Sequence, residues 1–278
     1  MDKHGNAAAP EELVWGPRAR LGFIDLSTSI VMSAELGRAL PAGVSALMTR
    51  IRLPRGEVSA RALGEMVESP RLEEAAHELA DGGAQVIVFG CTTGSLLGGP
   101  GFDQHLVGRL QQATGVAATT TSTAVLAAFH ATGVKRLGVG TPYIDELNNL
   151  EAPFLKGGGF EVVTLQGLQI DDDATIARVP YAETRRLAHA VARDADAVFL
   201  SCANLPTLQI LDELERELGC PVISSVAATI WHALHLAGVG ADRAGSGSLL
   251  AGGYRSDDPL GATSSSRTAV TASSVESA

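Results

Sequence analysis

Gly83–Cys91 reads GAQVIVFGC, and much further along the chain Asp194–Cys202 reads DADAVFLSC. Each stretch holds a short apolar run of the kind that forms a buried parallel strand, and each ends in a small residue and a cysteine. After each cysteine come a polar loop, an amphipathic helical stretch, a short strand with hydroxyl residues and a second apolar helix. The alternative is that α/β units resemble one another in composition alone, but the recurrence of cysteine at the same step favours an internal repeat.

Strand-like runs alternate with helical stretches along the body of the chain, which favours parallel sheets covered by helices. We therefore expect an α/β fold of two pseudo-symmetric, Rossmann-like (flavodoxin-like) parallel-sheet halves. The active site is expected in the cleft between the halves, where the carboxyl ends of both sheets meet. The predicted strands are Leu21–Leu26, Ser45–Leu53, Gln85–Gly90, Ala117–Thr121, Leu137–Gly140, Phe160–Leu165, Ala197–Leu200 and Val222–Ser224, and the clearest amphipathic helices are Pro70–Ala80, Asp103–Ala113, Ala182–Ala192 and Leu208–Leu218.

Both ends of the chain differ from this body in composition. Residues 1–19 are predicted to be a flexible leader, and residues 240–278, rich in Gly, Ser and Ala, a disordered low-complexity tail. Residues 20–125 form the predicted first half with the Cys91 loop, and the chain is expected to cross back near the end of that half. Residues 126–239 form the predicted second half with the Cys202 loop.

Composition excludes several classes of partner. The 278 residues include 21 Lys and Arg against 31 Asp and Glu, and the resulting net charge of −10 argues against nucleic-acid binding. No segment reaches the roughly 18 apolar residues that span a bilayer, and the N-terminus lacks the apolar core of a secretory signal. Three cysteines fit neither a disulfide framework nor a zinc ribbon. We expect a cytoplasmic protein that binds neither membrane nor nucleic acid.

The two repeated cysteines are the strongest candidates for chemistry. Cys91 lies in GCTTGS (Gly90–Ser95) and Cys202 in SCANLP (Ser201–Pro206). A thiol where a strand ends and a helix begins is close to free backbone N–H groups and to the positive end of a helix dipole, which lowers its pKa. Both are therefore predicted to be reactive, whereas Cys220 is predicted to be structural.

Two facing thiols allow two mechanisms. One thiolate can remove a proton beside a carboxylate while the other returns it on the opposite face. Alternatively, one thiolate can add to an activated double bond, permit rotation and leave. Neither route requires a metal, a nucleotide or a flavin, so no cofactor is expected. His232 and His235 are three residues apart on a helix, but no further ligand cluster accompanies them, and no metal site is predicted.

The motifs resemble those of the aspartate/glutamate racemase superfamily. The most similar branch contains maleate cis-trans isomerases, arylmalonate decarboxylases and the A-type protein of ectoine-utilisation operons. The resemblance runs from about Arg20 to Val239. It is carried by GCTTGS, TPYIDELN (Thr141–Asn148), IDDDATIARV (Ile170–Val179), SCANL (Ser201–Leu205) and IWHALHLAG (Ile230–Gly238).

The resemblance implies roles for individual residues. Cys91 falls where maleate isomerases carry the nucleophile, and Cys202 falls on the second cysteine of isomerases and racemases. The decarboxylases have glycine at the first position, so two cysteines argue against plain decarboxylation. Asp172 falls near an isomerase asparagine, where an acid repels a second carboxylate unless it is protonated. The residues that the resemblance and the loops together place at the substrate are Ser29, Thr92, Thr93, Tyr143, Asp172, Ala203 and Asn204.

These observations lead to one function hypothesis and two alternatives. The first is a cofactor-independent isomerase or racemase that uses two cysteines on a small carboxylate or dicarboxylate, most concretely like a maleate cis-trans isomerase. The alternatives are an arylmalonate-type decarboxylase and an accessory or metabolite-binding protein of ectoine utilisation. Apolar helix faces favour a homo-oligomer, either a dimer or a tetramer.

Overall fold

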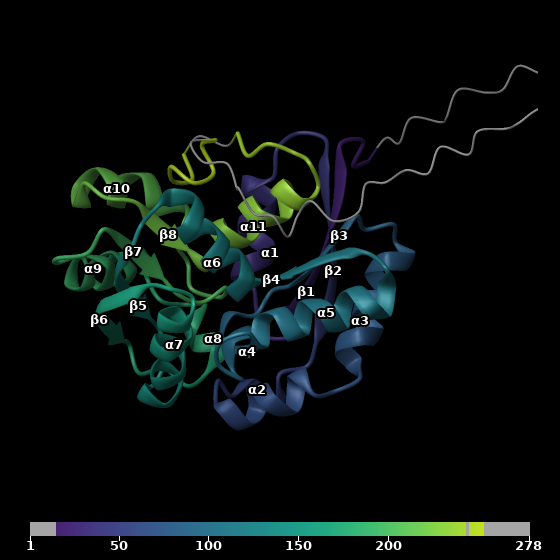
Figure 1. Ribbon diagram of the computed structural model, residues 1–278, viewed down its shortest axis with the longest axis horizontal. Coiled ribbons are helices and arrows are strands. Elements are labelled where there is room, and N and C mark those ends of the chain that lie inside the picture. Colours follow the sequence, from purple (N-terminus) through teal and green to yellow (C-terminus); the bar gives the residue numbers. More distant parts are fainter. Residues whose placement is uncertain (1–14, 243–244, 253–278) are drawn as a thin grey trace, which may run out of the picture.

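A computed structural model describes residues 15–242 and 245–252 as two four-stranded parallel sheets flanked by helices (Figure 1). The first sheet has the order β2-β1-β3-β4 and the second the order β6-β5-β7-β8, so the two halves share one topology. This equivalence confirms the predicted α/β repeat, and each predicted strand is present. The strands are β1 (Ala19–Leu26), β2 (Val44–Ile51), β3 (Val86–Phe89), β4 (Ala117–Thr120), β5 (Arg136–Thr141), β6 (Glu161–Gly167), β7 (Ala197–Leu200) and β8 (Val222–Ser224).

Helices connect the parallel strands and cover the sheets (Figure 1). The four predicted amphipathic helices are found, with their ends shifted by a residue or two and with the last one beginning as a 3-10 turn. The helices are α1 (Val31–Ala39), α2 (Ala60–Val67), α3 (Arg71–Asp81), α4 (Thr92–Leu96), α5 (Phe102–Thr114), α6 (Thr121–Thr132), α7 (Asp145–Gly157), α8 (Asp173–Ile176), α9 (Tyr181–Val191), α10 (Leu211–Leu218) and α11 (Ser225–Leu236), with 3-10 helices η1 (Pro54–Gly56) and η2 (Leu208–Ile210).

Equivalent local signals produce equivalent elements in the two halves. Helices α5 and α10 end at Gly115 and Gly219, each with φ of 69°, a left-handed conformation that favours glycine. Helices α6 and α11 begin after Thr120 and Ser224, whose side chains accept hydrogen bonds from backbone N–H groups of the first turn. The central strands β3 and β7 are fully buried, as their apolar runs predict.

Helices α6 and α11 join the two halves through the centre of the molecule (Figure 1). They pack against each other, and α11 also contacts β3 and β4 of the first sheet. Thr229 Oγ1 donates to Thr121 Oγ1 at 3.2 Å, and Thr119 Oγ1 lies 2.9 Å from Nδ1 of His232. Because the main apolar core is continuous across both halves, their strand ends are held in one fixed relation.

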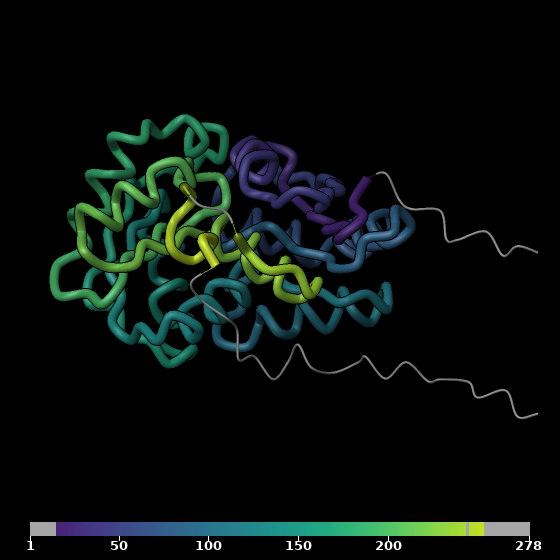
Figure 2. Tube along the Cα trace, turned by 90° about the horizontal axis from the view of Figure 1, so that it is seen from above, coloured from purple at the N-terminus to yellow at the C-terminus, as the bar shows by residue number. Residues whose placement is uncertain are grey.

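The predicted ends of the folded body need one correction. Most of the predicted leader and tail (residues 1–14, 243–244 and 253–278) lies outside the described residues. However, Leu249 and Leu250 are buried in the core, and the backbone N–H of Gly247 donates to Asp212 on α10 at 2.6 Å. Figure 2 shows this yellow segment folded back against the second half. The prediction of disorder from residue 240 was wrong here, because a leucine pair within the Gly- and Ser-rich stretch still buries apolar surface.

No helix in residues 15–242 and 245–252 is long and apolar enough to cross a membrane.

Candidate active site

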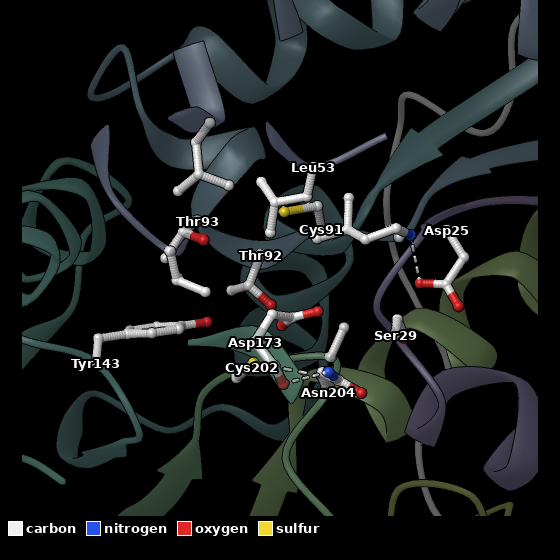
Figure 3. Close-up of a pocket in the computed structure, with 15 residues that line it drawn as sticks. Asp25, Ser29, Leu53, Cys91, Thr92, Thr93, Tyr143, Asp173, Cys202 and Asn204 are labelled. Carbon is white, nitrogen blue, oxygen red and sulfur yellow. Dashed lines mark hydrogen bonds between the residues drawn. The ribbon is translucent and has the colours of Figure 1, made fainter. Parts of the chain in front are cut away.

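The carboxyl ends of strands from both halves line one small pocket, with a cavity volume of about 20 Å³ (Figure 3). It contains both repeated cysteines, at the position that the repeat predicts. Because parallel strands place their carboxyl ends at one edge, segments far apart in sequence meet there. The lining residues are Asp25, Leu26, Ser29, Leu53, Val58, Leu63, Gly90, Cys91, Thr92, Thr93, Tyr143, Asp173, Cys202, Ala203 and Asn204.

Cys91 follows β3 and serves as the N-cap of α4. Its backbone is extended, with φ of −129°, and its Sγ accepts a hydrogen bond from the backbone N–H of Gly94 at 3.3 Å. A β-carbon on Gly94 would lie 3.0 Å from that sulfur, so glycine lets the backbone approach the thiol. The small residues of the GCTTGS motif thus place a thiol directly against the first turn of a helix.

Cys202 follows β7 in a different backbone conformation. Its φ is 104°, a region that residues other than glycine rarely adopt. The backbone N–H of Cys202 donates to Ser225 Oγ at 3.0 Å, and Cys202 Sγ accepts from the N–H of Asn204 at 3.3 Å. The strained backbone is therefore held by α11 on one side and by its own loop on the other.

Burial controls the acidity of both thiols. It raises the pKa of Cys91 to about 12 and that of Cys202 well above its ordinary value, with Asp173 adding to both effects. The hydrogen bonds from Gly94 and Asn204 oppose these shifts but do not overcome them. The loop N–H groups therefore lower the thiol pKa values as predicted, but the prediction of a net lowering was wrong, because the loss of hydration outweighs a few N–H dipoles.

Tyr143 enters the pocket from the TPYIDELN segment after β5. Thr141 Oγ1 accepts from the backbone N–H of Tyr143 at 3.2 Å and donates to Asn148 Oδ1 at 2.7 Å. Asn148 Nδ2 in turn donates to the carbonyl oxygen of Tyr143 at 3.2 Å. This closed set of bonds fixes the backbone of Tyr143. The ring hydroxyl points into the pocket (Figure 3) and is a hydrogen-bonding neighbour of Cys202.

The predicted hydroxyl residues all line the pocket but have different surroundings. Thr92 Oγ1 donates to Ser225 Oγ at 3.0 Å and so links the first half to α11. Thr93 lies beside Cys91. Ser29 Oγ is buried and has no partner of good hydrogen-bond geometry among the described residues. Ser29 nevertheless lies beside Asp25, whose pKa its side chain lowers.

Asn204 and Ala203 also line the pocket, but the Asn204 amide is engaged within the protein. Its Oδ1 accepts from the N–H groups of Ile30 and Val31 at 3.1 and 3.2 Å, and its Nδ2 donates to the carbonyl oxygen of Asp173 at 2.9 Å. Asn204 thus joins the start of α1 in the first half to α8 in the second.

With this geometry in view, comparison with known proteins decides the family. A family model described as arylmalonate decarboxylase matches residues 52–250, well over half of the chain. The chain belongs to this family. Arylmalonate decarboxylase of Bordetella bronchiseptica is 37% identical over 199 residues, which cover 70% of this chain and 82% of that protein. The predicted superfamily resemblance is thereby confirmed.

Maleate isomerases are also similar, over a larger share of both chains. Maleate isomerase of Geobacillus stearothermophilus is 28% identical over 255 residues, covering 84% of this chain and 98% of that protein. A solved structure of the maleate isomerase Iso from Pseudomonas putida S16 with maleate has a TM-score of 0.80 and 25% identity, and covers 85% of this chain and 98% of that one. This member of the arylmalonate decarboxylase family therefore shares its fold with both kinds of enzyme.

Two acidic residues line the pocket of this arylmalonate decarboxylase family member. Asp173 lines it, whereas the predicted Asp172 caps α8, where its Oδ2 accepts from the N–H of Thr175 at 2.7 Å. Asp25 at the end of β1 is also a lining residue, and the sequence analysis missed it. Asp25 could have been found from the sequence, because it is the next-to-last residue of the predicted strand Leu21–Leu26, whose carboxyl end faces the cleft.

The remaining candidates lie elsewhere. Cys220 is half-buried outside the pocket, and all three cysteines are free. Within residues 15–242 and 245–252, no group of three or more His, Cys, Asp or Glu side chains could hold a metal ion.

Proposed function

We propose that the protein is a cofactor-independent isomerase that acts on a small dicarboxylate, most concretely by interconverting maleate and fumarate. The observation that carries this proposal is the pair of buried thiols, Cys91 and Cys202, at equivalent strand ends of one pocket. The similarity to maleate isomerases over nearly their whole length supports the same reaction.

The proposed chemistry begins with the thiolate form of one cysteine. Cys91 sulfur adds to an alkene carbon, and the π electron pair takes up the proton of the Cys202 thiol at the neighbouring carbon. Rotation about the resulting single bond brings the carboxylates from cis to trans. Cys202 thiolate then removes the proton, the alkene re-forms, and the C–S bond breaks to return Cys91 thiolate. Protons and charge balance over the cycle without a cofactor.

The proposed carboxylate holders are neutral hydrogen-bond donors. Ser29, Thr93 and Tyr143 contribute hydroxyl groups, and the cysteine loops contribute backbone N–H groups, including that of Ala203. Such groups can bind a carboxylate without a cation when they are fixed beforehand. Thr92 already donates its hydroxyl proton to Ser225, so in this scheme it shapes the pocket rather than donating to the carboxylate. In this scheme Asn204 acts by holding its loop rather than through a free amide.

The experiment that tests the function is proton NMR of maleate in deuterated buffer with the purified protein. We expect the maleate signal to be replaced by that of fumarate. Cys91→Ala and Cys202→Ala should each reduce turnover by roughly a thousandfold, within the range for loss of a nucleophile or a general acid. Cys220→Ala, the matched control outside the pocket, should retain the wild-type rate. Near-normal turnover in both pocket variants would refute the proposal.

Decarboxylation of a substituted malonate is the second candidate. It is favoured by the family model and by the 37% identity to arylmalonate decarboxylase. Cys202 alone would then protonate the enediolate left by carbon dioxide, and Cys91 would be dispensable. Carbon dioxide release from a panel of malonates, retained in Cys91→Ala, would favour this reaction over isomerisation.

The proposal also covers the compartment in which the enzyme works and its oligomeric state. Free thiols fit a reducing compartment, and we propose the cytoplasm. A homo-oligomer is also part of the proposal and can be tested by light scattering. An accessory or metabolite-binding role in ectoine utilisation is the outcome favoured if dicarboxylates bind without turnover.

A further inference from the structure

The candidate active-site pocket combines two acids with no fixed cation. Asp25 and Asp173 are only 0% and 2% exposed, and both line the space between the two thiols. No Lys, Arg or His is among the described residues that line this pocket. A dianionic substrate would therefore enter a site that already contains two carboxyl groups.

Asp25 makes a hydrogen bond of good geometry through only one of its oxygens within the described residues. Its Oδ1 accepts from the N–H of Leu26 at 2.8 Å, while Oδ2 has no partner of good geometry among the described residues, although Ser29 is its neighbour. The charged groups that face it are Arg50 on β2 and Asp173 on α8. The Arg50 guanidinium donates to the carbonyl oxygens of the loop after β1, at 2.6 Å for Ser29, and is not a lining residue.

Asp173 faces the thiols from the other half. Its Oδ2 accepts from Thr28 Oγ1 at 2.5 Å, and the Asn204 side chain is a second hydrogen-bonding neighbour. The negative charge of Asp172 is adjacent, and Asp173 itself acts on both Cys91 and Cys202. Asp173 therefore has hydroxyl and amide neighbours but no cationic one.

Burying like charges together is unfavourable. A carboxylate that loses its hydration without a cation either takes up a proton or costs several kcal/mol, and a second carboxylate nearby strengthens that preference. A neutral carboxylic acid, by contrast, offers an O–H that a substrate carboxylate can accept. The two aspartates can therefore serve as donors once they are protonated.

We propose that Asp25 and Asp173 bind the substrate as neutral carboxylic acids, each donating a hydrogen bond, so that a dicarboxylate enters the pocket together with protons from solvent. This inference rests on the proposed function in taking a dicarboxylate as the ligand. The acids are already poised for it, since burial raises the pKa of Asp25 to about 6 and also raises that of Asp173. An incoming dianion raises both further.

Neutral acids also affect the thiols. The charge of Asp173 raises the pKa of both Cys91 and Cys202, and the charge of Asp25 raises that of Cys91. Proton uptake removes these charges when substrate binds. The protons taken up therefore offset, beside the thiols, the negative charge that the dianion brings.

The test uses succinate, a saturated dicarboxylate that has no double bond to isomerise. Its affinity for the full chain is measured by titration calorimetry between pH 7 and pH 9, in two buffers of different ionisation enthalpy. We expect net proton uptake, with affinity falling about tenfold per pH unit for each acid that must be protonated. This measurement on the wild-type protein needs no variant.

Variants of the two aspartates show whether the protons taken up with succinate bind to these side chains. Asp25→Asn and Asp173→Asn keep a neutral donor, so each should reduce the pH dependence by about one proton. Because pH 8 lies two units above the pKa of Asp25, Asp25→Asn should bind succinate about a hundredfold more tightly than wild type at that pH, and Asp173→Asn should also bind it more tightly. Asp81→Asn, at the exposed end of α3 and outside the pocket lining, should leave the pH dependence unchanged. Thermal unfolding checks that each variant is folded.

Three results would overturn the inference: affinity that does not change with pH, an undiminished pH dependence in both asparagine variants, or no succinate binding at any pH. The two proposals fail separately. Proton-coupled succinate binding without maleate turnover would refute only the isomerase, whereas turnover with pH-independent succinate affinity would refute only the role of the acids.

Discussion

The two cysteine loops end equivalent strands, yet they are built differently. Cys91 has an ordinary extended backbone and caps a helix that begins at the next residue. Cys202 has φ of 104° and is followed by a turn, with the next helical segment starting only at Leu208. The first loop is held by regular helix geometry and the second by contacts with α11 and its own turn.

Their neighbours differ as well. Tyr143 is a hydrogen-bonding neighbour of Cys202, whereas Asp25 acts on Cys91. A thiol against a helix start suits a nucleophile, and a thiol beside a phenol suits proton transfer. The comparison teaches that the repeat sets where each thiol lies, while the non-equivalent loops give the two thiols different surroundings.

The largest expected effect is the formation of a covalent adduct on one of the two cysteines but not on the other. If Cys91 is the nucleophile, Cys202→Ala incubated with maleate should accumulate a covalent adduct on Cys91. Cys91 can still add, and the neighbouring carbon can take its proton from water, but no Cys202 thiolate remains to remove that proton and re-form the alkene. Cys91→Ala should form none. Intact-mass spectrometry with peptide mapping measures this, and Cys220→Ala serves as the control that turns over without accumulating adduct. An adduct on Cys202 instead would reverse the two roles.

The next largest expected effect is on protein stability and involves Glu151, a buried acid next to the Cys202 loop. Glu151 is fully buried beside Ser201, and burial raises its pKa to about 7. The folded protein therefore holds this proton more tightly than the unfolded chain, and stability falls as pH rises from about 4.5 to about 7. We expect Glu151→Gln to be more stable than wild type by about 3 kcal/mol at pH 8 and nearly equal at pH 4.5. Urea unfolding at both values measures it; equal stabilities at pH 8 would contradict it.

Tyr143→Phe tests whether the two thiols have different hydrogen-bonding neighbours. It removes the hydroxyl beside Cys202 and leaves the Cys91 surroundings intact. We expect kcat to fall roughly 30-fold, as for loss of an aid to proton transfer. The rate at which iodoacetamide labels Cys91 at pH 8.5 should remain unchanged. A fall in that labelling rate would mean that Tyr143 supports both loops.

The smallest effect tests the backbones directly. At residue 202 the positive φ favours glycine, so Cys202→Gly should be more stable than Cys202→Ala by about 1 kcal/mol. At residue 91 the extended φ reverses the order, and Cys91→Gly should be less stable than Cys91→Ala by a similar amount. Chemical unfolding of the four variants measures both differences. The same order at both positions would show that the loops do not differ in strain.

Much of the fold could be predicted from local patterns. The apolar runs ending at Cys91 and Cys202 are buried strands, and Gly115 and Gly219 end equivalent helices. The core contribution of Leu249 could not be predicted from composition, because a short apolar pair depends on a partner surface for its burial.

The site was predictable in its residues but not in its electrostatics. The pocket contains Ser29, Thr92, Thr93, Tyr143, Ala203 and Asn204 with both cysteines, but Asp173 stands there in place of Asp172. Which of the two adjacent aspartates faces the pocket depends on where helix α8 begins, and the irregular loop before it gives no sequence signal for that residue. The thiol pKa values followed burial rather than helix dipoles, since hydration depends on every element around the pocket.

The sequence by itself determined the internal repeat, the order of strands and helices along the chain, and the two cysteines that end equivalent strands. It could do so because hydrophobic periodicity and turn residues act over a few positions. Only the tertiary structure decided which acids share the pocket with those thiols and how strongly each group holds its proton. Both depend on long-range packing that brings the ends of β1, β3 and β7 together and excludes water.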